Sequence, residues 1–122
     1  MLAASFSLLF LLAVGCSAER GREETPAEAI LRGKALYQRH GCPVCHGREG
    51  RGDGPMARNF NPRPRDFREQ SAFKNGRSLE AIAETIEKGL LEEGVGMPGY
   101  PHLANDERRA IAAYVGALRA TD

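Results

Sequence analysis

Three stretches of the chain place their apolar residues at the spacing of one helix face. The sequence predicts helices from about Ala27 to Arg39, from Leu79 to Lys88, and from Asp106 to Arg119. The residues that mark one face of each are Ile30, Gly33, Lys34 and Tyr37 in the first helix, Leu79, Ile82, Ala83 and Ile86 in the second, and Ile111, Tyr114, Val115 and Leu118 in the third. No run of alternating apolar and polar residues indicates a strand, so the expected fold class is all-α.

Residues that commonly begin and end helices stand at the boundaries of these stretches. Pro26 suits the start of the first helix, and Gly41 lies beyond its end. Ser78 can cap the second helix, and Gly89 can end it. Asn105 is expected to cap the third helix.

The segments between the helices are long and irregular. Gly47 to Arg77 and Leu90 to Pro101 are rich in glycine and proline and show no helical or strand period. A structureless loop as long as the first one is unusual inside a compact domain. A loop of this length is expected if it wraps a cofactor. An apolar cofactor would also enlarge the modest core that so short a chain can bury.

The chain begins with an apolar, uncharged segment from Leu2 to Val14. This length suits the hydrophobic region of a signal peptide and falls short of the roughly 20 residues that span a bilayer. Residues 1–15 are therefore expected to be a signal peptide, and the rest of the chain is expected to be exported.

Cys16 ends this segment in the run Ala13-Val14-Gly15-Cys16, which resembles the lipobox of bacterial lipoproteins. The cysteine of a lipobox is acylated and becomes the mature N-terminus. We therefore expect Cys16 to carry a lipid anchor and the polar residues 16–27 to form a flexible tether. The alternative is an ordinary signal peptide that is cleaved after Ala18.

The other two of the three cysteines stand in the run Cys42-Pro43-Val44-Cys45-His46. Cys-x-x-Cys-His is the attachment signature of c-type haem. Two thiols add to the two vinyl groups at one haem edge, and the adjacent histidine is the proximal ligand of the iron. The sequence therefore predicts one covalent haem c, held by Cys42, Cys45 and His46.

Three other interpretations of this run fit less well. A thioredoxin-like dithiol would require a preceding strand and a βαβ pattern, and neither is predicted. A zinc site would require a second pair of ligands at short spacing. A structural disulfide between Cys42 and Cys45 would leave His46 without a role.

The segment from His40 to Asp66 resembles the haem-binding region of small monohaem class I cytochromes c of bacteria. The shared features are the Cys-His-Gly run, the Gly-Asp-Gly-Pro run and the Pro-x-Asp-Phe that follows, while Gly96-Met97-Pro98 resembles the distal loop of the family. The resemblance implies that residues 28–122 form one cytochrome c domain. Its fold would be the class I cytochrome c fold, with three main helices and long loops wrapped around one haem.

The resemblance also implies roles for individual residues. Met97 would be the distal iron ligand, and the carbonyl of Pro55 would accept a hydrogen bond from the second ring nitrogen of the proximal histidine. Gly33 and Tyr37 on the first helix, and Tyr114 on the last, match the crossing of the terminal helices in this family.

The distal ligand has rivals among the residues that can bind iron. Met56 lies in the loop expected on the proximal side, and His40 is too close to Cys42 to reach across the ring. His102 is the strongest rival because it lies in the same loop as Met97. The flanking glycine lets the backbone approach closely and the flanking proline stiffens the loop, so Met97 is favoured.

Charge narrows the choice of partners. The net charge is +1 at pH 7, which argues against a nucleic-acid partner. Basic residues dominate the segment 48–77, and acidic residues dominate the segment 80–93. These segments are either two solvated faces or a dipole that orients a redox partner.

A haem with both axial positions filled predicts single-electron transfer and no enzyme activity. We expect a bacterial periplasmic or respiratory electron carrier that exchanges electrons with redox-partner proteins, either as a monomer or as a subunit of a respiratory complex. One alternative is a haem enzyme or gas sensor with an open or labile distal site. Another is a fixed subunit through which electrons pass into a larger oxidoreductase.

Overall fold

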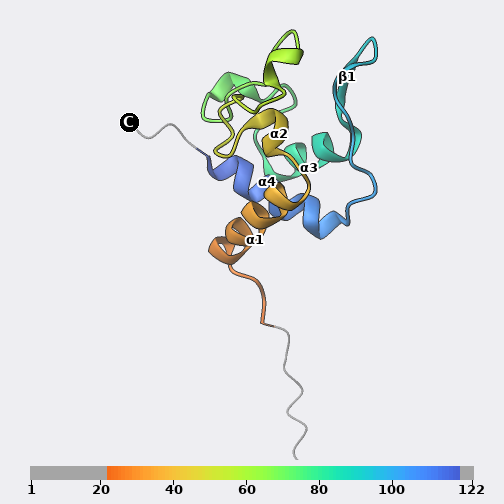
Figure 1. Cartoon of the computed structure of the whole chain (residues 1–122). Coiled ribbons are helices and arrows are strands. Elements are labelled where there is room, and N and C mark those ends of the chain that lie inside the picture. Colours follow the sequence, from red (N-terminus) through yellow and green to blue (C-terminus); the bar gives the residue numbers. More distant parts are fainter. Residues whose placement is uncertain (1–21, 119–122) are drawn as a thin grey trace, which may run out of the picture.

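The computed structural model describes residues 22–118, shown in Figure 1. The signal peptide and Cys16 lie outside these residues. The described part contains the α-helices α1 (Pro26–Arg39), α2 (Pro43–His46), α3 (Leu79–Lys88) and α4 (Asn105–Ala117), the 3-10 helices Ala57–Asn59 and Gln70–Ala72, and the strands β1 (Leu90–Glu92) and β2 (Val95–Met97). Within residues 22–118, no helix has the length and apolar character needed to cross a membrane.

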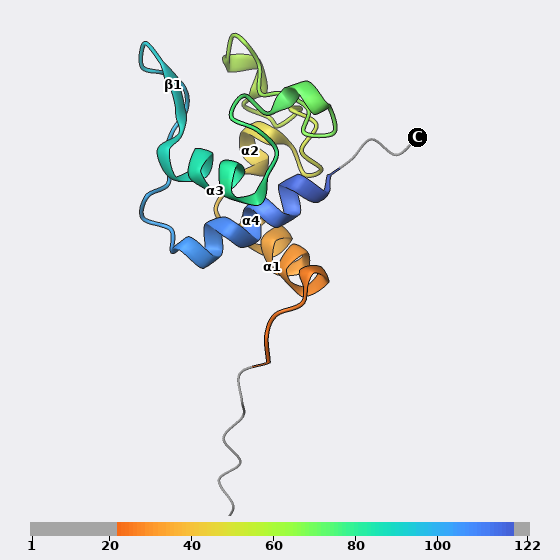
Figure 2. The same ribbon diagram turned by 180° about the vertical axis from the view of Figure 1, so that it is seen from behind.

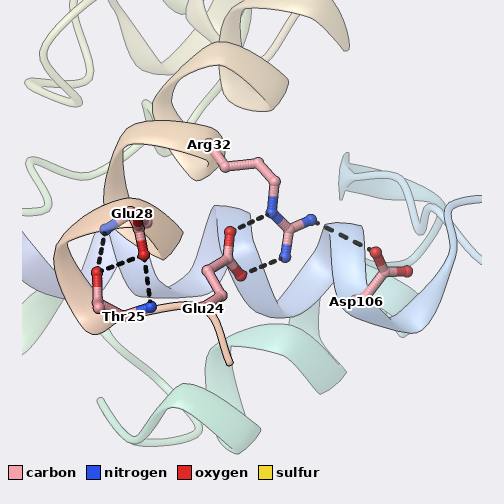
Figure 3. Close-up of polar contacts among 5 residues, drawn as sticks. All are labelled: Glu24, Thr25, Glu28, Arg32 and Asp106. Carbon is pink, nitrogen blue, oxygen red and sulfur yellow. Dashed lines mark hydrogen bonds and ion pairs between the residues drawn. The ribbon is translucent and has the colours of Figure 1, made fainter. Parts of the chain in front are cut away.

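Helix α1 begins at Pro26 and is capped by its own sequence. The hydroxyl of Thr25 accepts a hydrogen bond from the backbone N–H of Glu28 at 3.3 Å, and the Glu28 carboxylate accepts one from the N–H of Thr25 at 2.8 Å. Arg32 donates to the two carboxylate oxygens of Glu24 at 2.7 and 2.8 Å and reaches Asp106 on α4 at 3.4 Å (Figure 3). The chain is thus tied to the folded domain from Glu24 onward.

This start corrects one boundary of the predicted tether. Pro26 and Ala27 were included in the predicted tether, although Pro26 was also expected at the start of the first helix and Ala27 within it; both belong to α1, as the helix prediction has it. The reason is the reciprocal cap formed by Thr25 and Glu28, which satisfies backbone N–H groups at the helix start and extends the helix to the proline.

Helices α1 and α4 cross in backbone contact, as the resemblance implied. A Cβ atom at Gly33 would lie 1.9 Å from the carbonyl oxygen of Ala110, so only glycine permits this approach. Beside the crossing, the rings of Tyr37 and Tyr114 pack edge to face with their centroids 5.2 Å apart.

Helix α3 completes the core by packing against α4. Its boundaries are those predicted: the Ser78 hydroxyl accepts a hydrogen bond from the N–H of Ala81 at 3.1 Å, and Gly89 ends the helix with a φ of 76°. The buried hydrophobic residues of the core come from all three long helices and the loop before α4: Leu36, Tyr37, Ile82, Ala83, Ile86, Leu103, Ala110, Ile111, Ala112, Tyr114 and Val115.

Three details of the predicted helices are wrong. Asn105 does not cap α4 but is its first residue, and the N-cap residue is Ala104. The N–H of Ala104 donates a hydrogen bond to the Glu107 carboxylate at 3.1 Å. Lys34 is exposed, whereas Leu36, which the helical spacing did not mark, is buried. The buried residues of α1 are Gly33, Leu36 and Tyr37.

The segment expected to be a structureless loop after α3 contains an antiparallel hairpin. Strands β1 and β2 pair Leu90 with Met97 and Glu92 with Val95, and the two residues between them have positive φ angles, as two-residue hairpin turns require. The strands are only three residues long, so no alternation could be recognised in the sequence. The fold class stays all-α, with this small sheet added. In Figures 1 and 2 the hairpin and α2 rise on the same side of α4, opposite α1.

Replacing Gly33 with alanine is expected to destabilise the protein, because the new Cβ would overlap the Ala110 carbonyl. Overpacking of this kind typically costs about 1–3 kcal/mol of unfolding free energy. Denaturant titration of the purified protein measures the loss. The matched control is Gly116→Ala on α4, where the nearest atom to a Cβ is 3.6 Å away. There alanine should stabilise the helix by about 0.5–1 kcal/mol. Equal stability of both variants and the parent would contradict the crossing.

Candidate haem site

Helix α2 is a single turn that, together with its N-cap residue Cys42, carries the three predicted haem-attachment residues. Residues three and four apart lie on the same side of a helix, so this turn groups Cys42, Cys45 and His46. It is joined to α1 by a hydrogen bond from the N–H of Cys42 to the carbonyl of Tyr37, at 3.1 Å. The structure therefore brings the three residues together as the motif requires.

The chemistry of the cysteines disfavours the competing interpretations. Cys42 and Cys45 are both free and partly buried, so they form no disulfide. Burial raises the pKa of the Cys42 thiol to about 11, opposite to the lowered pKa of reactive dithiols. Among the described residues, no group of three or more His, Cys, Asp or Glu side chains could hold a metal ion. These findings disfavour the disulfide, the thioredoxin-like site and the zinc site.

His46 has the protonation state that a metal ligand needs. Burial of its ring lowers the pKa to about 4, so the imidazole is neutral at pH 7 and keeps a nitrogen lone pair for a metal. One face of the imidazole lies on the ring of Phe67, with centroids 4.6 Å apart and planes 28° apart. Phe67 belongs to the Pro-x-Asp-Phe run, but no local pattern in the sequence indicates that it contacts His46.

Pro55 does not have the predicted contact in this structure. The Nδ1 atom of His46 is buried and has no hydrogen-bond partner among the described residues, so no bond to the Pro55 carbonyl is formed. The imidazole lies flat against Phe67 instead. The chain just before Pro55 is bound to α2 through its backbone, with the N–H of Gly54 donating to the carbonyl of Cys45 at 3.2 Å.

The loop after His46 is folded tightly over α2. The N–H of Gly52 donates to the carbonyl of His46 at 2.9 Å, and the N–H of Met56 donates to that of Val44 at 3.0 Å. A Cβ at Gly54 would lie 2.4 Å from the Val44 carbonyl oxygen. Glycine at this position therefore permits the close approach of loop and helix.

Two tyrosines connect this loop to the crossing of α1 and α4. The hydroxyl of Tyr37 donates to the carbonyl of Gly47 at 2.7 Å, and that of Tyr114 donates to the carbonyl of Arg48 at 3.3 Å. Gly47 and Arg48 follow His46 directly in the chain. The helix crossing thus fixes the backbone next to the predicted proximal ligand.

The candidates for the distal ligand differ in their surroundings. Met97 ends β2 and is partly buried against the hydrophobic core. His102 is exposed, and Met56 is 44% exposed. His40 follows α1, and its Nε2 lies 3.8 Å from the Glu107 carboxylate. Among these four, Met97 has the surroundings expected of a side chain that covers a buried ligand site.

Tyr100 is a further residue of this region that the sequence analysis missed. Its N–H donates to the carbonyl of Ile86 at 2.8 Å, which fastens the segment after Met97 to α3. Burial raises the pKa of the Tyr100 hydroxyl, and the nearby thiols of Cys42 and Cys45 raise it further. In the sequence, only the place of Tyr100 three residues after Met97 could have indicated that it belongs to this region.

The residues of this region fit a haem. They supply two free thiols on one helical turn, a neutral imidazole and a thioether. A set of partly buried apolar side chains surrounds the core next to them: Cys42, Phe67, Phe73, Leu79, Met97, Tyr100 and Leu118. A large flat apolar group bound here would bury these side chains further.

Comparison with known proteins gives the same result. Residues 30–119 match the family model described as cytochrome c. The chain is 30% identical over 108 residues to cytochrome c oxidase subunit 2 of Alkalihalophilus pseudofirmus, an alignment that covers 86% of this chain and 30% of that protein. Among solved structures it resembles a chain of the reducing HAO-like protein complex of Kuenenia stuttgartiensis, with a TM-score of 0.67 and 34% identity, over 80% of this chain and 46% of that one.

The chain thus spans less than half the length of either of these proteins. The family match, by contrast, covers most of the present chain, including every residue of the haem site described above. The helical architecture agrees with it, apart from the added hairpin. The chain belongs to the cytochrome c family: it has the class I cytochrome c fold, carries a covalently bound haem c that contains iron, and functions in electron transfer.

Proposed function

We propose that this protein is an exported single-electron carrier with one haem, attached through Cys42 and Cys45 and ligated by His46 and Met97. The observation that carries the proposal is the arrangement of α2 and the hairpin. One helical turn with its N-cap residue groups the two thiols and the imidazole, and Met97 is partly buried at the end of the hairpin. The hairpin and α2 lie on the same side of α4 (Figures 1 and 2).

His46 and Met97 have different roles in the proposed site. A bound haem supplies an iron that gains and loses one electron. His46, with its neutral imidazole, would supply one ligand to the iron. Met97 would supply the other through its thioether, a ligand that favours the reduced state and would raise the reduction potential. With both residues bound, small molecules would be kept from the metal, which would favour electron transfer over catalysis.

The hairpin register supports Met97 over His102 as the distal ligand. Met97 is paired with Leu90 at the base of the hairpin, and the N–H of Tyr100 fastens the chain just beyond it to α3. Both ends of this short segment are therefore held by backbone hydrogen bonds. His102 lies beyond the fastened segment and is exposed.

The charge pattern supports a partner with an acidic docking surface. Four of the five glutamates in the acidic segment, Glu80, Glu84, Glu87 and Glu92, form ion pairs with basic residues. In contrast, the exposed residues Arg48, Arg58 and Arg63 have no carboxylate partner within residues 22–118. Because the glutamates are paired and these arginines are not, the charge pattern favours a positively charged loop over a dipole with two opposite faces. Such a loop attracts a partner with an acidic surface.

A second candidate is a subunit or domain that passes electrons into a larger oxidoreductase. The observation that favours it is the size of the two similar proteins, of which this chain covers 30% and 46%. Size-exclusion chromatography of the native protein in a mild detergent distinguishes the two. A free carrier elutes at the size of the single chain, whereas a subunit elutes with other polypeptides in fixed ratio.

The covalent attachment is tested with cysteine variants. Haem should remain on the parent protein after denaturation and extraction with acidic organic solvent. The double variant Cys42→Ser, Cys45→Ser should lose essentially all of its haem under these conditions, because no thioether bond can form. Cys16→Ser is the matched control and should retain the haem fully. Complete extraction of haem from the parent would contradict the proposed attachment.

The distal ligand is tested by comparing Met97→Ala with His102→Ala. Loss of the thioether should open a coordination position, so that the reduced Met97→Ala protein binds carbon monoxide while the parent does not. Its reduction potential should fall on the order of 0.1 V, within the roughly 0.8 V range that axial ligands span. The sulfur-to-iron charge-transfer band of the oxidised protein should vanish. His102→Ala should leave all three properties unchanged. The opposite pattern would indicate bis-histidine ligation.

The lipid anchor proposed at Cys16 is tested in the native host membrane. Acylated protein should partition into detergent, and Cys16→Ser should move it to the soluble fraction. Several lipid chains together hold a protein firmly at a membrane, whereas a single chain binds only marginally. Mass spectrometry of the mature N-terminus provides the independent readout. An unmodified terminus produced by cleavage after Ala18 would rule out the anchor and leave the haem site unaffected.

A further inference from the structure

A column of stacked side chains leads away from the predicted proximal ligand. The imidazole of His46 lies on Phe67 with centroids 4.6 Å apart, and Phe67 lies on Phe73 with centroids 5.8 Å apart. The planes in these two contacts differ by 28° and 29°, so each ring is stacked on the next. The guanidinium of Arg77 lies over the ring of Phe73, 4.8 Å from its centroid.

The middle ring of this column is held on several sides. The N–H of Phe67 donates to the carbonyl of Gly50 at 2.8 Å. Gly50 has a φ of 68°, and a Cβ there would lie 2.8 Å from the Phe67 ring, so this position requires glycine. Arg77 donates to the carbonyl of Leu118, the C-cap residue that follows α4, at 2.6 Å. The column is thus fastened to the loop and to the terminal helix.

Histidines that bind metals usually donate their second ring N–H to a fixed acceptor, which sets the orientation of the ring. In this structure the Nδ1 of His46 has no such partner among the described residues. The ring plane is restrained instead by face-to-face contact with Phe67. A restraint of this kind limits rotation of the imidazole without changing which nitrogen carries the proton.

We propose that Phe67 is the positioning residue of the proximal ligand: its ring sets the plane of the His46 imidazole. The inference rests on the proposed function in one respect, namely that His46 is an axial ligand of the haem. Phe67 acts through His46 and is not itself a ligand. Phe73 and Arg77 hold Phe67 in place.

The test uses the haem-loaded, purified protein and the variant Phe67→Leu. The orientation of an axial imidazole determines the pattern of haem-methyl shifts in the NMR spectrum of the oxidised, paramagnetic protein, and it affects the g values in electron paramagnetic resonance. Phe67→Leu should change the methyl pattern and add a second low-spin species. Phe67→Tyr, which retains a six-membered ring, should restore the parent spectra.

The matched control is Phe60→Leu. Phe60 is partly buried in the same loop and takes part in no aromatic stack within residues 22–118. This control should leave both spectra unchanged, even where it lowers the melting temperature. If Phe67→Leu lowers the melting temperature and leaves both spectra as in the parent, Phe67 only packs the loop and the inference is overturned.

A second measurement needs no variant. In the reduced, diamagnetic parent, nuclear Overhauser contacts should connect the ring protons of His46 and Phe67, and their absence would overturn the inference even if Phe67→Leu yields no folded protein. Measurements on the parent protein also distinguish a failure of the proposed function from a failure of the role proposed for Phe67. A parent in which the iron lacks a histidine ligand contradicts the proposed function. A parent with histidine ligation and no response to Phe67→Leu contradicts only the role of Phe67.

Discussion

The backbone contact of α1 with α4 at Gly33 is the constraint on which the haem site depends. Because the helices touch at this glycine, Tyr37 and Tyr114 meet edge to face beside it. Their hydroxyl groups then bind the carbonyls of Gly47 and Arg48. The packing of two helices far apart in the sequence is thereby transmitted to the backbone that follows His46. A wider crossing would move both hydroxyls away from this loop.

Two kinds of restraint hold the two residues proposed as axial ligands. Near His46, the proposed proximal ligand, the loop that follows α2 folds back onto that helix through backbone hydrogen bonds, and the imidazole rests on Phe67. Met97, the proposed distal ligand, lies at the end of a hairpin, and the chain beyond it is bound to α3. A rigid surrounding keeps the geometry of an iron site similar in its two oxidation states, which suits electron transfer.

The sequence predicted those parts of the fold that local chemistry determines. Ser78 and Gly89 mark the limits of α3 because a cap and a left-handed stop act within a few residues. The run from Cys42 to His46 indicates haem because the attachment reaction needs that spacing. The hairpin was missed because three pairs leave no recognisable period. Leu36, Phe67 and Tyr100 were missed because their roles depend on contacts with segments distant in sequence, and the Pro55 contact drawn from the family resemblance is not formed.

The central claim is that a single haem, attached at α2, is ligated by the methionine of the hairpin. The most direct measurement is NMR of the reduced protein with its methionine methyl groups isotopically labelled. A methyl group above the centre of the ring is shifted far upfield by the ring current. The account predicts one such signal, assigned to Met97 because it persists in Met56→Leu and disappears in Met97→Leu. Ordinary shifts for every methionine methyl, or an upfield signal from Met56, would contradict it.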